Sequence, residues 1–236
     1  MKIEELSVFF PAYNEEANIK TTVTRATKIL PKIAKKWEII VVNDGSTDKT
    51  GKIVEKLIKK DKRIRMITHT LNRGYGAALK SGFYNSQYEW IAFTDADGQF
   101  DFAEITKFFA LQEEANADLV IGYYLKREVP FYRILGSRLW EFLVFLTFGL
   151  RARDIDCGFK LIKREVVEKI PKLEAERGPF ISSELLIKAK KAGFKIVEVG
   201  VYHYPRKAGR ATGISLKVIL SGFTDLLKLY RKLKRL

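Results

Sequence analysis

An apolar run leads directly into a pair of acids in the stretch Trp90-Ile91-Ala92-Phe93-Thr94-Asp95-Ala96-Asp97-Gly98-Gln99. The apolar run has the pattern of a buried strand, and open α/β sheets bind ligands at the carboxyl ends of such strands. Asp95 and Asp97 share a face while the chain stays extended, and Gly98 permits a turn that brings the amide oxygen of Gln99 towards them. Three hard oxygen ligands suit Mg²⁺ or Mn²⁺. Taken alone, Asp-x-Asp is also typical of two solvated loop acids.

Apolar strands and helical segments alternate on both sides of this stretch. Strands are predicted at 6–10, 37–42, Ile64–Thr68, 118–121 and Ile196–Val201, and helices at Thr50–Lys60, 72–84, 102–115 and Phe131–Phe148. The alternation predicts one Rossmann-like α/β domain whose central sheet is mostly parallel and is covered on both faces. The polar segments 11–15, 43–48 and 95–99 should then meet at one edge of the sheet.

Charge and composition restrict the class of function. A net charge of +15 in 236 residues calls for an anionic partner, such as a phosphorylated substrate, lipid headgroups or nucleic acid. Cys157 is the single cysteine, which excludes an internal disulfide, and two distant histidines do not predict a zinc site. The longest apolar stretch, 142–150, is too short to span a bilayer, and residues 1–5 lack the pattern of a secretory signal. We therefore expect a cytoplasmic protein, peripheral on the inner face of the membrane.

Four motifs occur in order along the first part of the chain. They are Phe10-Pro11-Ala12-Tyr13-Asn14-Glu15-Glu16, Val41-Val42-Asn43-Asp44-Gly45-Ser46-Thr47-Asp48, Asn72-Arg73-Gly74 and Thr94-Asp95-Ala96-Asp97-Gly98-Gln99. Together they resemble family 2 glycosyltransferases, and within that family the dolichyl-phosphate mannose and glucose synthases. The resemblance implies a GT-A fold over residues 1–213, with a nucleotide diphosphate sugar bound over the first half.

The resemblance also implies roles for individual residues. The nucleotide diphosphate sugar would be bound by Pro11, Tyr13, Glu15, Asp44 and Asp95, and the Mg²⁺ or Mn²⁺ ion by Asp95, Asp97 and Gln99. Without the resemblance, Pro11 and Tyr13 would be interpreted as a strand-terminating turn, and Asp44-Gly45 as a tight turn. A dinucleotide interpretation of Gly74-x-Gly76 is disfavoured, because Leu79 stands where the third glycine belongs.

Arginines surround an apolar helical segment in the second half of the chain. An acceptor phosphate could be held by Arg133, Arg138, Arg151 and Arg153. The residues that follow, Asp154 to Phe159, resemble the Asp-x-x-Ser/Cys-Gly-Phe element of the same synthases. A later basic loop with Arg206 and Arg210 resembles the loop that closes over the donor and acceptor phosphates in these enzymes. Taken alone, such a loop is more often simply solvated.

These observations support a hypothesis of inverting hexose transfer. The donor would be GDP- or UDP-hexose and the acceptor polyprenyl or dolichyl phosphate, with Asp97, Arg206 and Arg210 in catalytic roles. A phosphate monoester is mostly dianionic at neutral pH and needs no general base. The alternative is transfer to a sugar hydroxyl with Glu184 or Asp156 as the base. Glu184 is also interpretable as a capping-box glutamate.

Residues 214–236 have the pattern of a basic amphipathic helix. Its apolar face is flanked by Lys and Arg, which is typical of a helix on an anionic membrane surface. A helix packed on the domain or on a partner is the alternative. A non-enzymatic protein that binds anionic membrane or nucleic acid is a remote alternative. A nucleic-acid partner is not expected, because the basic residues form no recognisable nucleic-acid module.

Overall fold

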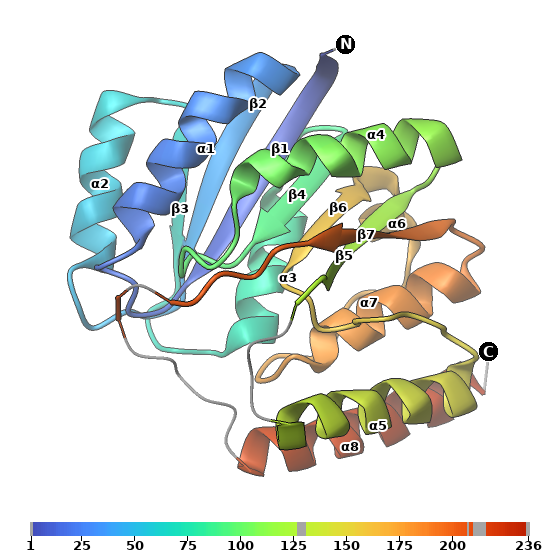
Figure 1. Ribbon diagram of the computed structural model, residues 1–236. Helices are drawn as coiled ribbons and strands as arrows, with labels where there is room; N and C mark the ends of the chain where they lie inside the picture. The colour runs from blue at the N-terminus through green and yellow to red at the C-terminus, as the bar shows by residue number, and fades with distance from the viewer. Residues whose placement is uncertain (1, 127–130, 207, 210–215, 235–236) are drawn as a thin grey trace.

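The computed structural model describes residues 2–126, 131–206, 208–209 and 216–234, and their side chains except those of 131–133 and 216–221. Within these residues, seven strands form one sheet in the order β3-β2-β1-β4-β6-β5-β7 (Figure 1). The strands are β1 (Ile3–Ala12), β2 (Ala34–Asn43), β3 (Ile64–Thr68), β4 (Trp90–Thr94), β5 (Leu119–Tyr124), β6 (Phe159–Lys163) and β7 (Ile196–Val201). β6 runs antiparallel to β4 and β5, and the other pairs are parallel. The predicted α/β class with a mostly parallel sheet is confirmed.

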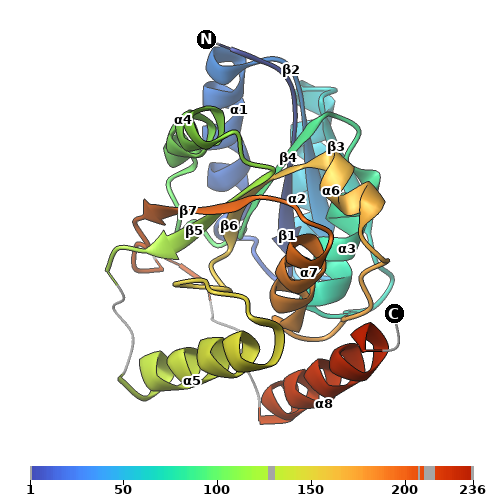
Figure 2. The same cartoon turned by 90° about the vertical axis from the view of Figure 1, so that its right-hand side faces the viewer.

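Helices cover both faces of this sheet. They are α1 (Ile19–Ile33), α2 (Thr50–Lys60), α3 (Tyr75–Asn85), the 3₁₀ turn η1 (Phe102–Glu104), α4 (Ile105–Ala115), α5 (Phe131–Phe148), α6 (Arg164–Lys169), α7 (Phe180–Lys191) and α8 (Leu216–Leu233). One apolar core lies between the sheet and α1, α2 and α4, and a second lies between the sheet and α3, α6 and α7. Figure 2 shows α1 and α4 on one side of the sheet and α3, α6 and α7 on the other.

The strand order places three polar segments next to one another. β1 pairs with β2 on one side and with β4 on the other, so the carboxyl ends of all three lie along one edge. Ala12 pairs with Asn43 at the end of β1 and β2, and the Asp44 N–H donates to the Ala12 carbonyl at 2.9 Å. The predicted meeting of residues 11–15, 43–48 and 95–99 follows from this topology.

Helices α5 and α8 lie side by side beyond α7 in both views (Figures 1 and 2). Trp140 and Phe223 have ring centroids 5.5 Å apart, and those of Phe148 and Tyr230 are 6.1 Å apart. Trp140 Nε1 also donates to Ser183 Oγ of α7 at 3.0 Å. α8 packs on the domain through the buried side chains of Leu226, Leu229 and Leu233. In the described part of the chain, no helix is both long and apolar enough to cross a membrane. The predicted boundary at residues 213 and 214 lies outside the described residues.

Candidate active site

Asp95 directly follows β4 and lies in closely packed surroundings. The Tyr75 hydroxyl donates to Asp95 Oδ1 at 3.0 Å. A Cβ atom on Gly158 would lie 2.3 Å from Asp95 Oδ2, so only a glycine lets that part of the chain pack against the carboxylate. Burial, followed by the neighbouring charge of Asp97, raises the pKa of Asp95 to about 7, although Tyr75 and Lys160 oppose the rise. The charge on Asp95 therefore changes near neutral pH.

Asp97 and Gln99 form the turn that follows. Gly98 has a φ of 75°, in the left-handed region that glycine tolerates, and the Gln99 N–H donates to Asp97 Oδ1 at 3.0 Å. The Gln99 side chain donates through Nε2 to the Tyr204 carbonyl at 2.9 Å. Because only the nitrogen of the amide makes this bond, the Oε1 atom remains the group that can bind a cation.

The segment after β7 crosses this loop. The Tyr204 N–H donates to the Gln99 carbonyl at 2.8 Å, which pins the two segments together from both sides. Two residues later, Arg206 Nη2 donates to Glu15 Oε1 at 2.5 Å and lies 3.5 Å from Asp97 Oδ2. One guanidinium thus bridges a carboxylate that follows β1 and a carboxylate that follows β4.

The donor atoms of this loop fit a hard divalent cation. Among the residues that the structure describes, no three His, Cys, Asp or Glu side chains form a metal-binding group. The groups of this loop that would hold such an ion are the Asp95 and Asp97 carboxylates and the Gln99 amide oxygen, with water or a diphosphate completing the shell. Mg²⁺ is commonly bound through few carboxylates in this way. The Arg206 cation beside Asp97 shows that positive charge is accommodated at this position.

Metal binding at this loop should depend on pH. An ion must displace the proton that Asp95 carries below its pKa of about 7. We expect the affinity for Mn²⁺ to fall about tenfold for each pH unit below that value and to level off above it. Calorimetric titration at pH 6, 7 and 8 measures this. Tyr75→Phe should move the fall to higher pH, because the Tyr75 hydrogen bond lowers the pKa of Asp95. Equal affinity at pH 6 and 8 would contradict the expectation.

Asp44 directly follows β2 and is almost fully buried. Its carboxylate accepts from His69 Nδ1 at 2.5 Å, the Arg73 N–H at 3.0 Å and the Gly74 N–H at 2.8 Å. On the neighbouring strand, Pro11 is buried within β1, whereas Tyr13 is partly exposed just after it. The predicted nucleotide-binding residues therefore lie along adjacent strand ends, with Asp44 held by the protein itself.

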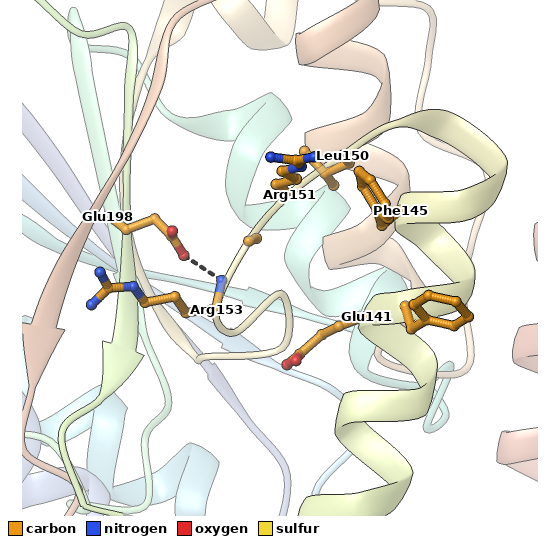
Figure 3. A pocket seen from close by; sticks show the side chains of 8 residues that line it. Glu141, Phe145, Leu150, Arg151, Arg153 and Glu198 are labelled. Carbon is orange, nitrogen blue, oxygen red and sulfur yellow. Dashed lines mark hydrogen bonds between the residues drawn. The ribbon is translucent and has the colours of Figure 1, made fainter.

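Two cavities lie between α5 and the loop at residues 150–154. The larger, of about 520 Å³, is lined by residues that include Tyr123, Tyr124, Arg138, Arg153 and Asp154. The smaller, of about 330 Å³, is lined in part by Glu141, Phe145, Arg151, Arg153 and Glu198 (Figure 3). Arg153 has its guanidinium carbon 4.6 Å from the Tyr123 ring centre, and the backbone N–H of Arg153 donates to Glu198 Oε1 at 2.6 Å. Three of the four predicted arginines therefore border this pair of cavities, and the Arg133 side chain lies outside the described residues.

The family model described as "Glycosyl transferase family 2" matches residues 7–171, well over half of the chain. The chain belongs to glycosyl transferase family 2. A dolichyl-phosphate beta-glucosyltransferase from Homo sapiens is 33% identical over 217 residues, which cover 84% of this chain and 67% of that protein. A dolichyl-phosphate beta-glucosyltransferase from Saccharomyces cerevisiae is 34% identical over 221 residues, which cover 83% of this chain and 66% of that protein. This family 2 chain thus spans about two thirds of the length of these curated relatives.

A solved structure shares the fold of this family 2 chain. It is a glucosyl-3-phosphoglycerate synthase from Mycobacterium tuberculosis in complex with Mg²⁺ and UDP. The TM-score is 0.69 at 17% identity, over 94% of this chain and 79% of that one. At this identity the likeness concerns the fold alone. The GT-A fold predicted from the motifs is confirmed.

Glu184 of this family 2 chain lies in a buried ion pair. The carboxylate is 2% exposed and accepts a hydrogen bond from Lys188 Nζ at 2.5 Å. It also accepts from the N–H groups of Glu174 and Ala175, at distances between 2.8 and 3.0 Å. The capping-box alternative is wrong, because α7 begins at Phe180 without a side-chain cap. These contacts favour a structural role for Glu184, whereas Asp156, the other candidate base, is partly exposed.

Three residues at the site were not assigned to it from the sequence. Tyr75 contacts Asp95, and His69 contacts Asp44. Lys160 is fully buried in β6, donates to the Cys157 carbonyl, and lies with its Nζ 5.5 Å from the Phe93 ring centre. The sequence signal for Lys160 is a charge inside the apolar run Phe159-Lys160-Leu161-Ile162. Arg210, predicted to assist Arg206, lies outside the described residues.

Proposed function

We propose that this chain transfers a hexose from a nucleotide diphosphate sugar to a polyprenyl (dolichyl) phosphate, with inversion at the sugar. The names of the two curated relatives support the acceptor class. The observation that carries the proposal is a cavity lined by Arg138 and Arg153 beside α5, a helix that exposes large apolar side chains. Cationic and apolar groups placed together suit a lipid that ends in a phosphate better than a neutral glycan.

One group of residues would act on the donor phosphates, and another on the acceptor phosphate. Bound Mg²⁺ or Mn²⁺, held by Asp95, Asp97 and Gln99, would neutralise charge on the departing nucleoside diphosphate. Arg206 would exchange its contact with Glu15 for the donor phosphates, since guanidinium groups pair bidentately with phosphate. Arg138 and Arg153 would orient the acceptor phosphate. No residue has to remove a proton, because a phosphate dianion is already a competent nucleophile.

The hydrogen bonding of Asp44 favours uracil over guanine as the base of the donor nucleotide. A carboxylate offers about four acceptor positions, and three protein donors already occupy the Asp44 carboxylate. The position left suits the single imide N–H of uracil, whereas guanine presents two adjacent donor groups. We therefore propose a UDP-hexose as the donor.

A transfer assay tests the proposed reaction. The protein is incubated with Mn²⁺, UDP- and GDP-hexoses, and either polyprenyl phosphate or a free glycan. We expect transfer to the polyprenyl phosphate, and a rise of about tenfold in the acceptor KM of Arg153→Gln with the donor KM unchanged. Arg63→Gln, at an arginine stacked on Trp37 far along the sheet, is the matched control. Transfer to the glycan alone would overturn the lipid-phosphate assignment and leave the hydroxyl-directed alternative.

We also propose that α5 and α8 together lie on an anionic membrane surface, on the inner face of the membrane. α5 exposes one stripe of apolar side chains, formed by Leu135, Leu139, Phe142 and Leu146. α8 exposes another, formed by Phe223, Leu227 and Tyr230. Apolar patches of this extent mark interaction surfaces. Lys228, Arg231 and Lys232 on α8 add the positive charge that anionic headgroups attract.

Co-sedimentation with lipid vesicles tests the proposed membrane contact of α5 and α8. Leu139 and Leu146 are 56% and 69% exposed, so their replacement by Glu should leave the fold intact. Each change is expected to weaken partitioning onto vesicles with anionic lipid about tenfold, because a leucine then no longer enters the bilayer. Leu71→Glu, at a side chain 75% exposed on another part of the surface, is the control. Unchanged co-sedimentation of the α5 variants would contradict the proposed orientation.

A further inference from the structure

A buried chain of hydrogen bonds leads from Asp44 into helix α3. His69, which follows β3 and is 8% exposed, lies with its Nδ1 2.5 Å from Asp44 Oδ1. On the other side of the ring, Nε2 lies 2.8 Å from Ser81 Oγ. The His69 N–H also donates to the Asn43 carbonyl at 2.9 Å. His69 is therefore held to the end of β2 by its backbone N–H and its Nδ1 atom, and to α3 by its Nε2 atom.

The chemistry of the partners sets the direction of these bonds. An ionised carboxylate only accepts hydrogen bonds, so His69 Nδ1 carries the hydrogen that faces Asp44. In the neutral imidazole Nε2 is then the acceptor, and the Ser81 hydroxyl donates to it. Asp44 thus selects the tautomer of His69, Ser81 supports that tautomer by donating to Nε2, and His69 in turn orients the Asp44 carboxylate.

We propose that His69 and Ser81 are positioning residues of the donor site, which orient Asp44 so that its remaining acceptor position faces the nucleotide base. This inference rests on the proposed function, in which Asp44 binds the base. The Arg73 and Gly74 N–H groups hold one carboxylate oxygen each, but both belong to one loop segment, so on their own they leave the carboxylate free to move with that segment. The contact from His69 comes from a different strand end and removes that freedom.

The same three residue types form the triads of hydrolases, but this geometry does not support a nucleophilic Ser81. Ser81 lies within α3, which extends from Tyr75 to Asn85. The N–H groups around it are used in the helix, so they cannot form an oxyanion hole. The donor-site role therefore accounts for these contacts better than a second activity.

Ser81→Ala and His69→Leu test the inference, with His69→Asn as the conservative variant. His69→Leu is expected to raise the KM for UDP-hexose about tenfold with kcat nearly unchanged, because a hydrogen bond to a charged group is lost. Ser81→Ala, at a partly exposed position, should shift the KM in the same direction by a smaller factor. His69→Asn keeps a hydrogen-bond donor towards Asp44, so its KM for UDP-hexose should stay close to that of the unchanged protein. In Ser81→Ala and His69→Leu, the binding of uridine alone should weaken in parallel with the binding of UDP, and the preference for UDP over GDP should decline.

A purely structural role would give a different pattern. A lower unfolding midpoint in Ser81→Ala and His69→Leu, with an unchanged KM and an unchanged UDP preference, would overturn the inference. Asp44→Asn separates this failure from that of the proposed function. If Asp44→Asn weakens the binding of UDP but His69→Leu does not, only the positioning role fails. If Asp44→Asn leaves UDP binding unchanged, the base-binding role of Asp44 fails as well, and the inference with it.

Discussion

Replacing Asp97 by asparagine is expected to lower kcat/KM on the order of 1,000-fold, the largest effect of any single change at the proposed site. Asparagine keeps an oxygen that can accept the Gln99 N–H, so the turn after β4 is retained. The change removes the negative charge that faces Arg206 at 3.5 Å and that a divalent cation would require. The loss should therefore concern chemistry and metal binding, while the unfolding midpoint stays close to that of the unchanged protein.

Two measurements test this expectation for Asp97. Calorimetric titration with Mn²⁺ should show the loss of metal binding, and steady-state transfer should show the fall in kcat/KM. Asp101→Asn is the matched control, because Asp101 lies in the same loop but caps η1 by accepting the Ala103 N–H, a role that asparagine also fills. Full activity of Asp97→Asn, with Mn²⁺ bound as before, would show that the metal site lies elsewhere.

Much of the sheet can be predicted from apolar periodicity. Ile64–Thr68, Trp90–Thr94 and Ile196–Val201 are predicted with the bounds that the structure has. β1 and β2 are longer than predicted, because pairing between them continues beyond the apolar run from Ile3↔Ala34 to Ala12↔Asn43. β6 is not predicted at all. It has five residues with Lys160 at its second position, and its place depends on pairing with β4 and β5, which lie far away in sequence.

Some residues of the candidate site can be predicted from a local sequence motif, whereas others are brought there only by contacts between distant parts of the chain. Asp95, Asp97 and Gln99 stand within five residues, so a local pattern reveals them. Tyr75, His69 and Lys160 reach the site only through the strand order, and no spacing in the sequence relates them to it. The bridge from Arg206 to Glu15 joins residues 191 positions apart. The basic loop and Glu15 are each recognisable from the sequence, but their pairing is not.

Glu184 provides the second large expected effect, on stability rather than on catalysis. Replacing it by glutamine leaves Lys188 as a buried charge without its counter-ion, since the pair is 2% and 1% exposed. Breaking such a pair costs about 3–5 kcal/mol in the free energy of unfolding. The N–H groups of Glu174 and Ala175 also lose a charged acceptor that holds their segment against α7. At a temperature where the variant is folded, transfer to polyprenyl phosphate should nevertheless proceed at the normal rate per folded molecule.

The double variant Glu184→Gln/Lys188→Met is the matched control, because it removes the unpaired charge together with its partner. Chemical denaturation should show that it recovers most of the stability lost in Glu184→Gln, as expected when a buried ion pair is replaced as a unit. The two acceptor hypotheses predict opposite results here. A Glu184→Gln variant with a normal unfolding midpoint, intact UDP binding and almost no turnover would identify Glu184 as a general base. A base of that kind is required only by a hydroxyl acceptor, so this result would shift the assignment from a lipid phosphate to a sugar hydroxyl.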